Sequence, residues 1–131
     1  MGDETQFTLE QGIFVPRRRP HHRNEQYQEV GFEVLIRMQR EHFWYRGRHR
    51  LVLEVLRREI SRHYGKTGGV RAIDMGGGCG GWIEYLHAHA AGVFEELALG
   101  DSSWHALTLA EPVVGNFATR YQIDLLDLDW E

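Results

Sequence analysis

The chain has little cysteine and little proline: one cysteine, Cys79, and three prolines occur among 131 residues. A lone cysteine cannot form an intramolecular disulfide, which excludes a disulfide-stapled scaffold. No apolar run in the sequence approaches the roughly 18 residues that a membrane helix needs. The first residues lack the apolar stretch of a secretory signal. We therefore expect a cytoplasmic protein with no membrane partner and an ordinary core, since 42% of the residues are hydrophobic.

Several patterns that carry chemistry are also missing. The sequence contains neither a G-x-S-x-G nucleophile signature nor a Walker loop. His87 and His89 are two apart on an expected helix, so they face different sides and make a poor metal pair. Cys79 has no base near it in the sequence, and we interpret it as a small side chain in a loop rather than a nucleophile. No metal site is expected.

Charge is unevenly spread along the chain, whose net charge is −4. Residues 40–62 hold seven arginines and three acids, for a net +4, whereas residues 70–131 hold two arginines and ten acids, for a net −8. The acidic half makes nucleic acid an unlikely partner for the sheet. It is compatible with a cationic small-molecule cofactor.

Three segments differ in pattern. Residues 1–26, with the basic stretches Arg17–Arg19 and His21–Arg23, show little periodicity and are expected to form a flexible basic arm. Residues 27–66 are helical: an imperfect pattern covers 28–45, and a clearer helix runs from 48 to 64 and ends at Gly65. Residues 67–131 alternate between strand and helix patterns and are expected to form the cofactor-binding part.

This alternation predicts an α/β fold with a parallel, doubly wound sheet preceded by N-terminal helices. The sheet is expected to be incomplete, with about three strands. The expected elements are a strand at 70–75, a helix at 81–91, a strand at 95–99, a helix from Ser102 or Ser103 to Ala110, and a strand within 118–125.

The most informative stretch is the glycine-rich loop after the first of these strands. Glycine lacks a Cβ, so the loop can adopt positive φ and let a ligand lie against bare backbone. Residues 76–81 fit G-x-G-x-x-G, the dinucleotide fingerprint, and residues from Asp74 fit D-x-G-x-G-x-G. Asp101 follows the next strand where an acid would bind ribose hydroxyls under either interpretation.

Two features favour the second pattern. Asp74 lies on the strand end, where its carboxylate would repel a pyrophosphate but could hold an ammonium group. Residues 99–110 then resemble G-x-D-x-S-x-x-x-L-x-x-A, which they match at Asp101, Ser103, Leu107 and Ala110. Together these motifs resemble S-adenosylmethionine-dependent methyltransferases with a Rossmann-like fold, and the resemblance covers about residues 41–130.

The resemblance implies a set of cofactor-binding residues. The loop would cradle the methionine portion of S-adenosylmethionine, Asp101 followed by Ser102 would bind the ribose diol, and Asp124 followed by Leu125 would bind adenine. Asp127 is the alternative acid if the register differs by three residues. The stretch at 41–48 resembles a segment that places Tyr45 or Arg46 toward the cofactor. The loop residues in this set are Asp74, Gly76, Gly77, Gly78 and Gly80.

The family fold has more strands than this sequence supplies. Its first strand is normally central, so here we expect that strand to have one bare edge, open to self-association or to a partner chain. No catalytic residue and no methyl acceptor can be assigned, and weak or no turnover is expected of the chain alone. The alternatives are an NAD(P)-dependent oxidoreductase domain and a degenerate, non-catalytic half-domain that acts through a partner.

Overall fold

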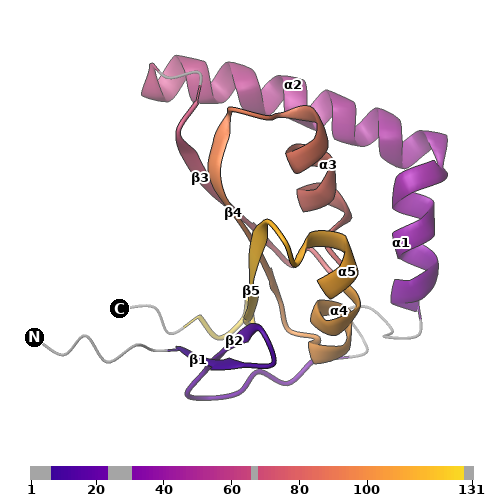
Figure 1. Ribbon diagram of the computed structural model, residues 1–131, viewed down its shortest axis with the longest axis vertical. Helices are drawn as coiled ribbons and strands as arrows, with labels where there is room; N and C mark the ends of the chain where they lie inside the picture. Colours follow the sequence, from indigo (N-terminus) through magenta and orange to yellow (C-terminus); the bar gives the residue numbers. More distant parts are fainter. Residues whose placement is uncertain (1–6, 24–30, 66–67, 129–131) are drawn as a thin grey trace, which may run out of the picture.

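The computed structural model describes residues 7–23, 31–65 and 68–128. These residues form an α/β fold with one five-stranded, mostly parallel sheet and helices packed against it (Figure 1). None of the helices in these ranges is long and apolar enough to cross a membrane.

The sheet has the strand order β1-β2-β5-β4-β3. The pairs β2·β5, β5·β4 and β4·β3 are parallel, and only β1·β2 is antiparallel. The strands are β1 (Phe7–Glu10), β2 (Ile13–Pro16), β3 (Val70–Met75), β4 (Phe94–Asp101) and β5 (Ala118–Gln122).

Two helices lie between β2 and β3, one follows β3, and two follow β4. The imperfect pattern around residue 42 marks a helix boundary: His42 is extended (φ −73°, ψ 129°), and its Nδ1 accepts a hydrogen bond from the amide of Trp44. The second helix therefore begins at 43 rather than 48, and it ends at Gly65 in the left-handed conformation, as predicted. The helices are α1 (Phe32–Glu41), α2 (Phe43–Tyr64), α3 (Gly81–His89), α4 (Trp104–Leu109) and α5 (Glu111–Val114).

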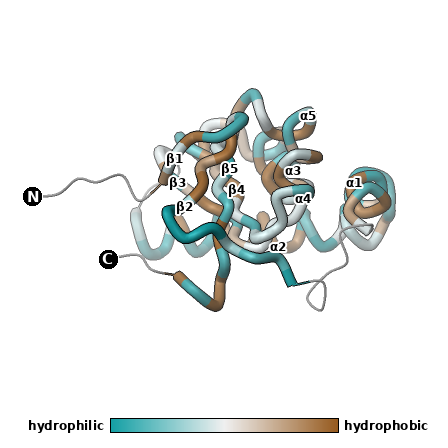
Figure 2. Tube along the Cα trace, turned by 90° about the horizontal axis from the view of Figure 1, so that it is seen from below, coloured by the Kyte–Doolittle hydropathy of each residue, from teal (hydrophilic) through white to brown (hydrophobic). Residues whose placement is uncertain are grey.

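The core lies between the sheet and one layer of helices. Apolar stretches run along the strands and through α3 (Figure 2), where Leu97 and Leu99 of β4 pack with Ile83 and Leu86 of α3. Helices α3, α4 and α5 lie on the same side of the sheet (Figure 1). This follows from the order β3-β4-β5, because successive right-handed crossovers that move in one direction place their helices on one face. The predicted double winding is thus not seen in the described residues.

The prediction of about three strands is wrong, because residues 7–16 form a β-hairpin where an arm was expected. Gln11 and Gly12 both have positive φ (48° and 78°), which suits a tight two-residue turn. Strand β2 then pairs in parallel with β5, with Ile13 opposite Arg120. Ile13 and Val15 are buried, so the hairpin adds to the core.

The opposite end of the sheet carries the expected bare edge. Among the described strands, β3 pairs only with β4. Its Ile73 is 39% exposed, which is high for an isoleucine within a strand. The edge that β5 would otherwise expose is covered by β2, so the two sides of the three-stranded parallel unit differ.

Substitution of Gly80 should test how closely the start of α3 packs against α5. Gly80 precedes α3 with φ 86°, and a Cβ there would lie 2.8 Å from a methyl group of Val114. We expect Gly80→Ala to lower the free energy of unfolding by about 2–4 kcal/mol, through backbone strain and overpacking. Urea unfolding measures the loss. Gly92→Ala is the matched control, because Gly92 has φ 84° with no atom within 4 Å of the added Cβ. Equal losses for the two variants would contradict the packing argument.

Candidate functional site

Three carboxylates gather at one edge of the sheet. Asp74 lies near the end of β3, Asp101 ends β4, and Asp124 follows the end of β5. The carboxyl ends of parallel strands meet at the same edge, and all three residues line one cavity of about 790 Å³. We call this the strand-tip cavity; its lining comprises His22, Phe32, Leu35, Gln39, Trp44, Tyr45, Arg48, Val52, Asp74, Gly76, Gly77, Gly78, Trp82, Asp101, Ser102, Ile123, Asp124, Leu125 and Leu126.

The glycine loop forms one wall of this cavity. Gly76 and Gly78 have φ of 84° and 59°, which residues with a Cβ rarely adopt. At Gly77 a Cβ would lie 2.5 Å from Oδ2 of Asp74, so only glycine lets the loop pass this close to the carboxylate. Gly80 does not line the cavity; it precedes α3 and packs against Val114.

Asp101 binds the loop and the following helix together. It is 8% exposed, and its Oδ2 accepts a hydrogen bond from the amide of Gly78 at 2.8 Å. Its Oδ1 accepts from the amide of Ser103 at 2.9 Å, and Ser103 in turn caps α4 as one of the two serines predicted to do so. Each carboxylate oxygen keeps a further lone pair for a ligand. The neighbouring Ser102 also lines the cavity.

Asp74 is the carboxylate with the least favourable surroundings. Burial raises its pKa above the ordinary range, the nearby Asp101 raises it further, and the guanidinium of Arg48 opposes both effects. The charged form is thus disfavoured in the folded chain. A cationic ligand in the cavity would relieve this cost.

Asp124 lies at the third strand tip and is fixed by its own turn. Its Oδ1 accepts a hydrogen bond from the amide of Leu126 at 2.9 Å, and its Oδ2 is 3.4 Å from the guanidinium of Arg23. Leu125 lines the cavity and is 51% exposed. The alternative acid, Asp127, does not line the cavity and instead pairs with Arg18.

Helix α2 supplies a wall that was only partly predicted. Tyr45, Arg48 and Val52 are spaced by three and four residues, so they share one helical face, and all three line the cavity. Tyr45 therefore faces the cavity as expected, whereas Arg46 does not line it. The helical spacing of three residues from Tyr45, within the stretch at 41–48, was the signal that could have identified Arg48.

The segment after β2 also borders the strand-tip cavity, which was not predicted. Because β2 runs parallel to β5, its end lies at the same edge as the strand tips, and the following residues pass along that edge. Nδ1 of His22 lies 2.8 Å from Oγ of Ser102, and the ring contacts Phe32. No local pattern signals this placement, since His22 and Ser102 are brought together by strand pairing alone.

No group of three or more histidines, cysteines, aspartates and glutamates among residues 7–23, 31–65 and 68–128 could hold a metal ion. Cys79 is fully buried, and its thiol donates a hydrogen bond to the carbonyl of Phe32 at 3.3 Å. Burial raises the pKa of the thiol to about 11. These features agree with a packed side chain and not with a nucleophile.

Cys79 should be unreactive in the folded chain. The thiolate is the reactive species, and both the raised pKa and the lack of access suppress it at pH 8 or below. An absorbance assay with an aromatic disulfide reagent should detect no free thiol in native buffer and one thiol per chain in denaturant. Rapid labelling of the native chain would contradict the burial.

Replacement of Asp74 should stabilise the folded chain at neutral pH. The pKa of Asp74 is higher in the folded chain than in the unfolded chain. Ionisation of Asp74 therefore lowers the free energy of unfolding as the pH rises through the unfolded and then the folded pKa, and the full loss is present above both values. Asp74→Asn removes this penalty, and the urea midpoint should increase at pH 7. The gain should shrink as the buffer approaches pH 3, where the wild-type carboxyl is protonated in both states. A lower midpoint at pH 7 would contradict this account.

The arrangement therefore combines a glycine loop, three strand-tip carboxylates, one guanidinium and an aromatic wall. Such a cavity can hold an elongated, partly cationic ligand with hydroxyl and amino groups. Comparison with known proteins adds no assignment: no family model, no curated protein and no solved structure matches the chain.

Proposed function

We propose that this chain is the cofactor-binding portion of an S-adenosylmethionine-dependent methyltransferase with a Rossmann-like fold. The observation that carries the proposal is the convergence of Asp74, Asp101 and Asp124 with the glycine loop on one cavity. By the resemblance of the motifs, each of these residues binds a different part of the same cofactor. They must then line a single cavity.

The cavity is suited to this cofactor in size and charge. Its volume of about 790 Å³ lies within the range of roughly 300–1,000 Å³ that is typical of small-molecule sites. The sulfonium and ammonium groups of S-adenosylmethionine are cationic, which suits the disfavoured charge on Asp74. Its carboxylate is suited to the guanidinium of Arg48, since arginine binds carboxylates through paired hydrogen bonds.

The remaining contacts follow from the geometry of the strand tips. Asp101 has lone pairs left for the ribose hydroxyls, and Asp124 can accept a hydrogen bond from the adenine amino group while Leu125 packs on the ring. The bare backbone of Gly76 and Gly78 allows close approach of the methionine portion. When bound, the cofactor supplies an activated methyl group, and this chain's residues bind it, orient it and limit water around it.

The same observations disfavour a nicotinamide cofactor. A pyrophosphate at the glycine loop would lie beside Asp74 and Asp101, whose like charges would repel it. The non-catalytic alternative is favoured by one observation, the bare edge of β3 with its exposed Ile73. Stable self-association by light scattering, together with no cofactor binding, would support that alternative.

Calorimetry with two ligands tests the proposal directly. We expect S-adenosylhomocysteine to bind the chain with a measurable heat and NAD to give none under the same conditions. The charge pattern of the cavity is the reason for this order of affinity. Preferential binding of NAD would exclude the methyltransferase proposal.

The ribose assignment can be tested at Asp101. We expect Asp101→Ala to weaken S-adenosylhomocysteine binding by about 1–3 kcal/mol, because polar groups in the cavity lose their partner. Asp127→Ala is the control: it removes the same charge from the same edge but lies outside the cavity lining, and affinity should not change. Thermal unfolding of both variants checks that the chain remains folded. An unchanged affinity for a folded Asp101→Ala chain would refute the ribose assignment.

A further inference from the structure

A different cavity, of about 640 Å³, lies between α1, α2 and α3. Five residues of α2 line it, and four of them lie on one helical face because Arg46 and Gly47 follow Phe43 by three and four positions and Arg50 follows Arg46 by four; the fifth is His49. We call it the basic groove, and its lining comprises Gln39, Arg40, Phe43, Arg46, Gly47, His49, Arg50, Gly81, Glu84, Tyr85, Ala88 and His89.

Positive charge dominates the lining. Three arginines face one glutamate, and that glutamate is already engaged: Arg40 donates to the two carboxylate oxygens of Glu84 at 3.1 and 2.8 Å. Arg46 and Arg50 have no ion pair or side-chain hydrogen bond with any described residue. Two arginines one helical turn apart, neither with a carboxylate partner among the described residues, are suited to an oxyanion, which guanidinium groups bind through paired hydrogen bonds.

Two buried polar atoms in the same lining also lack a partner. Nε2 of His49 and Oε1 of Gln39 make no hydrogen bond with the described part of the chain. His49 is 1% exposed, and its ring lies 5.2 Å from those of Trp82 and Tyr85. Buried polar groups are nearly always hydrogen-bonded in native proteins, so these two atoms have hydrogen-bonding capacity that the described residues leave unused.

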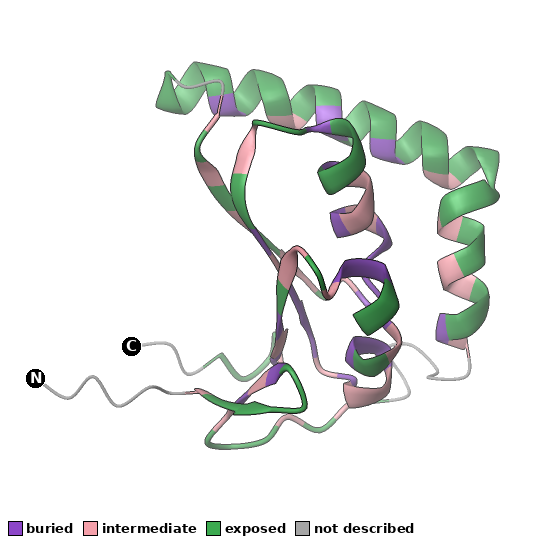
Figure 3. Cartoon of the chain, in the orientation of Figure 1, coloured by how far each residue is buried: buried purple, intermediate pink, exposed green. Residues whose placement is uncertain are grey.

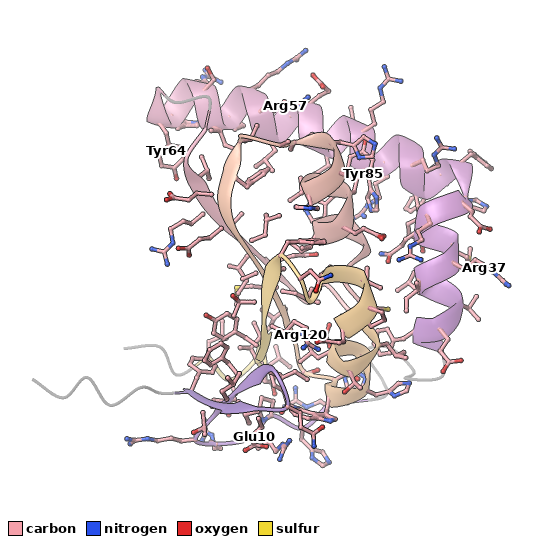
Figure 4. The ribbon with its side chains drawn as sticks, in the orientation of Figure 1. Glu10, Arg37, Arg57, Tyr64, Tyr85 and Arg120 are labelled. Atoms are coloured by element: carbon pink, nitrogen blue, oxygen red, sulfur yellow. The ribbon has the colours of Figure 1, made fainter. Side chains whose placement is uncertain are left out.

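The groove also offers apolar surface. Phe43 is 80% exposed, and Tyr85 extends from α3 toward α2 (Figure 4). Most of α2 is exposed (Figure 3), so this surface is accessible. The surface at Gly47 is open, because a Cβ there would meet no atom within 4 Å.

From these observations we infer that the basic groove is a binding site for a small organic oxyanion with an aromatic or apolar body. Arg46 and Arg50 hold the phosphate or carboxylate group, and Phe43 and Tyr85 contact the body. The site lies outside the strand-tip cavity apart from Gln39, which lines both. The inference does not rest on the proposed methyltransferase function.

Titration by two-dimensional amide NMR tests the site, with inorganic phosphate, phenyl phosphate and benzoate as probes and chloride at matched ionic strength as the blank. We expect shifts at the amides of Gly47, Arg50, Gly81 and Tyr85, with phenyl phosphate binding more tightly than inorganic phosphate. Benzoate reports whether a carboxylate is accepted in place of a phosphate. Shifts confined to other parts of the chain, or none with any probe, would overturn the inference.

Matched variants separate a built site from general charge. The double change Arg46→Ala and Arg50→Ala should weaken phenyl phosphate at least about ten-fold. Arg37→Ala is the control, because Arg37 lies on α1 and points away from the groove (Figure 4). The affinity of this variant for phenyl phosphate should match that of the wild-type chain. Equal losses in both would mean non-specific attraction and overturn the site.

Gly47 offers a test that keeps both arginines and the fold. Gly47→Glu places a carboxylate next to Arg46 and one helical turn from Arg50, and it should abolish phenyl phosphate binding, while Gly47→Ala should retain it. Both changes replace a glycine within α2, so neither is expected to destabilise the helix. Undiminished binding by a folded Gly47→Glu chain would overturn the inference.

Discussion

The strand-tip cavity depends on the hydrogen bonds that the carboxylate of Asp101 accepts from two backbone amides. Asp101 ends β4, and its two oxygens accept hydrogen bonds from the amides of Gly78 and Ser103. Hydrogen bonds to a charged group are worth about 1.5–3 kcal/mol each. They fix the glycine loop and the start of α4 to the same strand end. Asp101, which we propose to bind the ribose, thus also shapes the cavity through its hydrogen bonds to the loop and to α4.

Charge in this chain is sorted by structure into distinct surfaces. The basic segment after β2 lies along the acidic strand tips, where Arg18 and Arg23 pair with Asp127 and Asp124. Three arginines in the first turns of α2 divide by helical position: Arg48 lines the strand-tip cavity, while Arg46 and Arg50 line the basic groove. One helix therefore serves two cavities, because residues two apart on a helix point to different sides.

The winding of the sheet explains its two unlike edges. Crossovers that move in one direction place α3, α4 and α5 on one face and leave β3 as an edge strand among the described residues (Figure 1). At the other side the hairpin of β1 and β2 covers β5, and Phe14 stacks on Tyr121 with ring centroids 5.2 Å apart. Among the described strands, β1 and β3 are the two edges of the sheet, and the β3 edge leaves backbone groups of the parallel unit open to another strand.

Local signals in the sequence were enough to predict β3, β4, β5, the end of α2 at Gly65 and a cap at Ser102 or Ser103, because alternation, glycine conformation and capping act over a few residues. The acids at the strand ends could be predicted to meet, since parallel strands align their carboxyl ends. Tertiary structure alone determined the pairing of β2 with β5, the place of His22 and the division of the α2 arginines. These depend on contacts between residues far apart in the chain, whose energies no local pattern encodes.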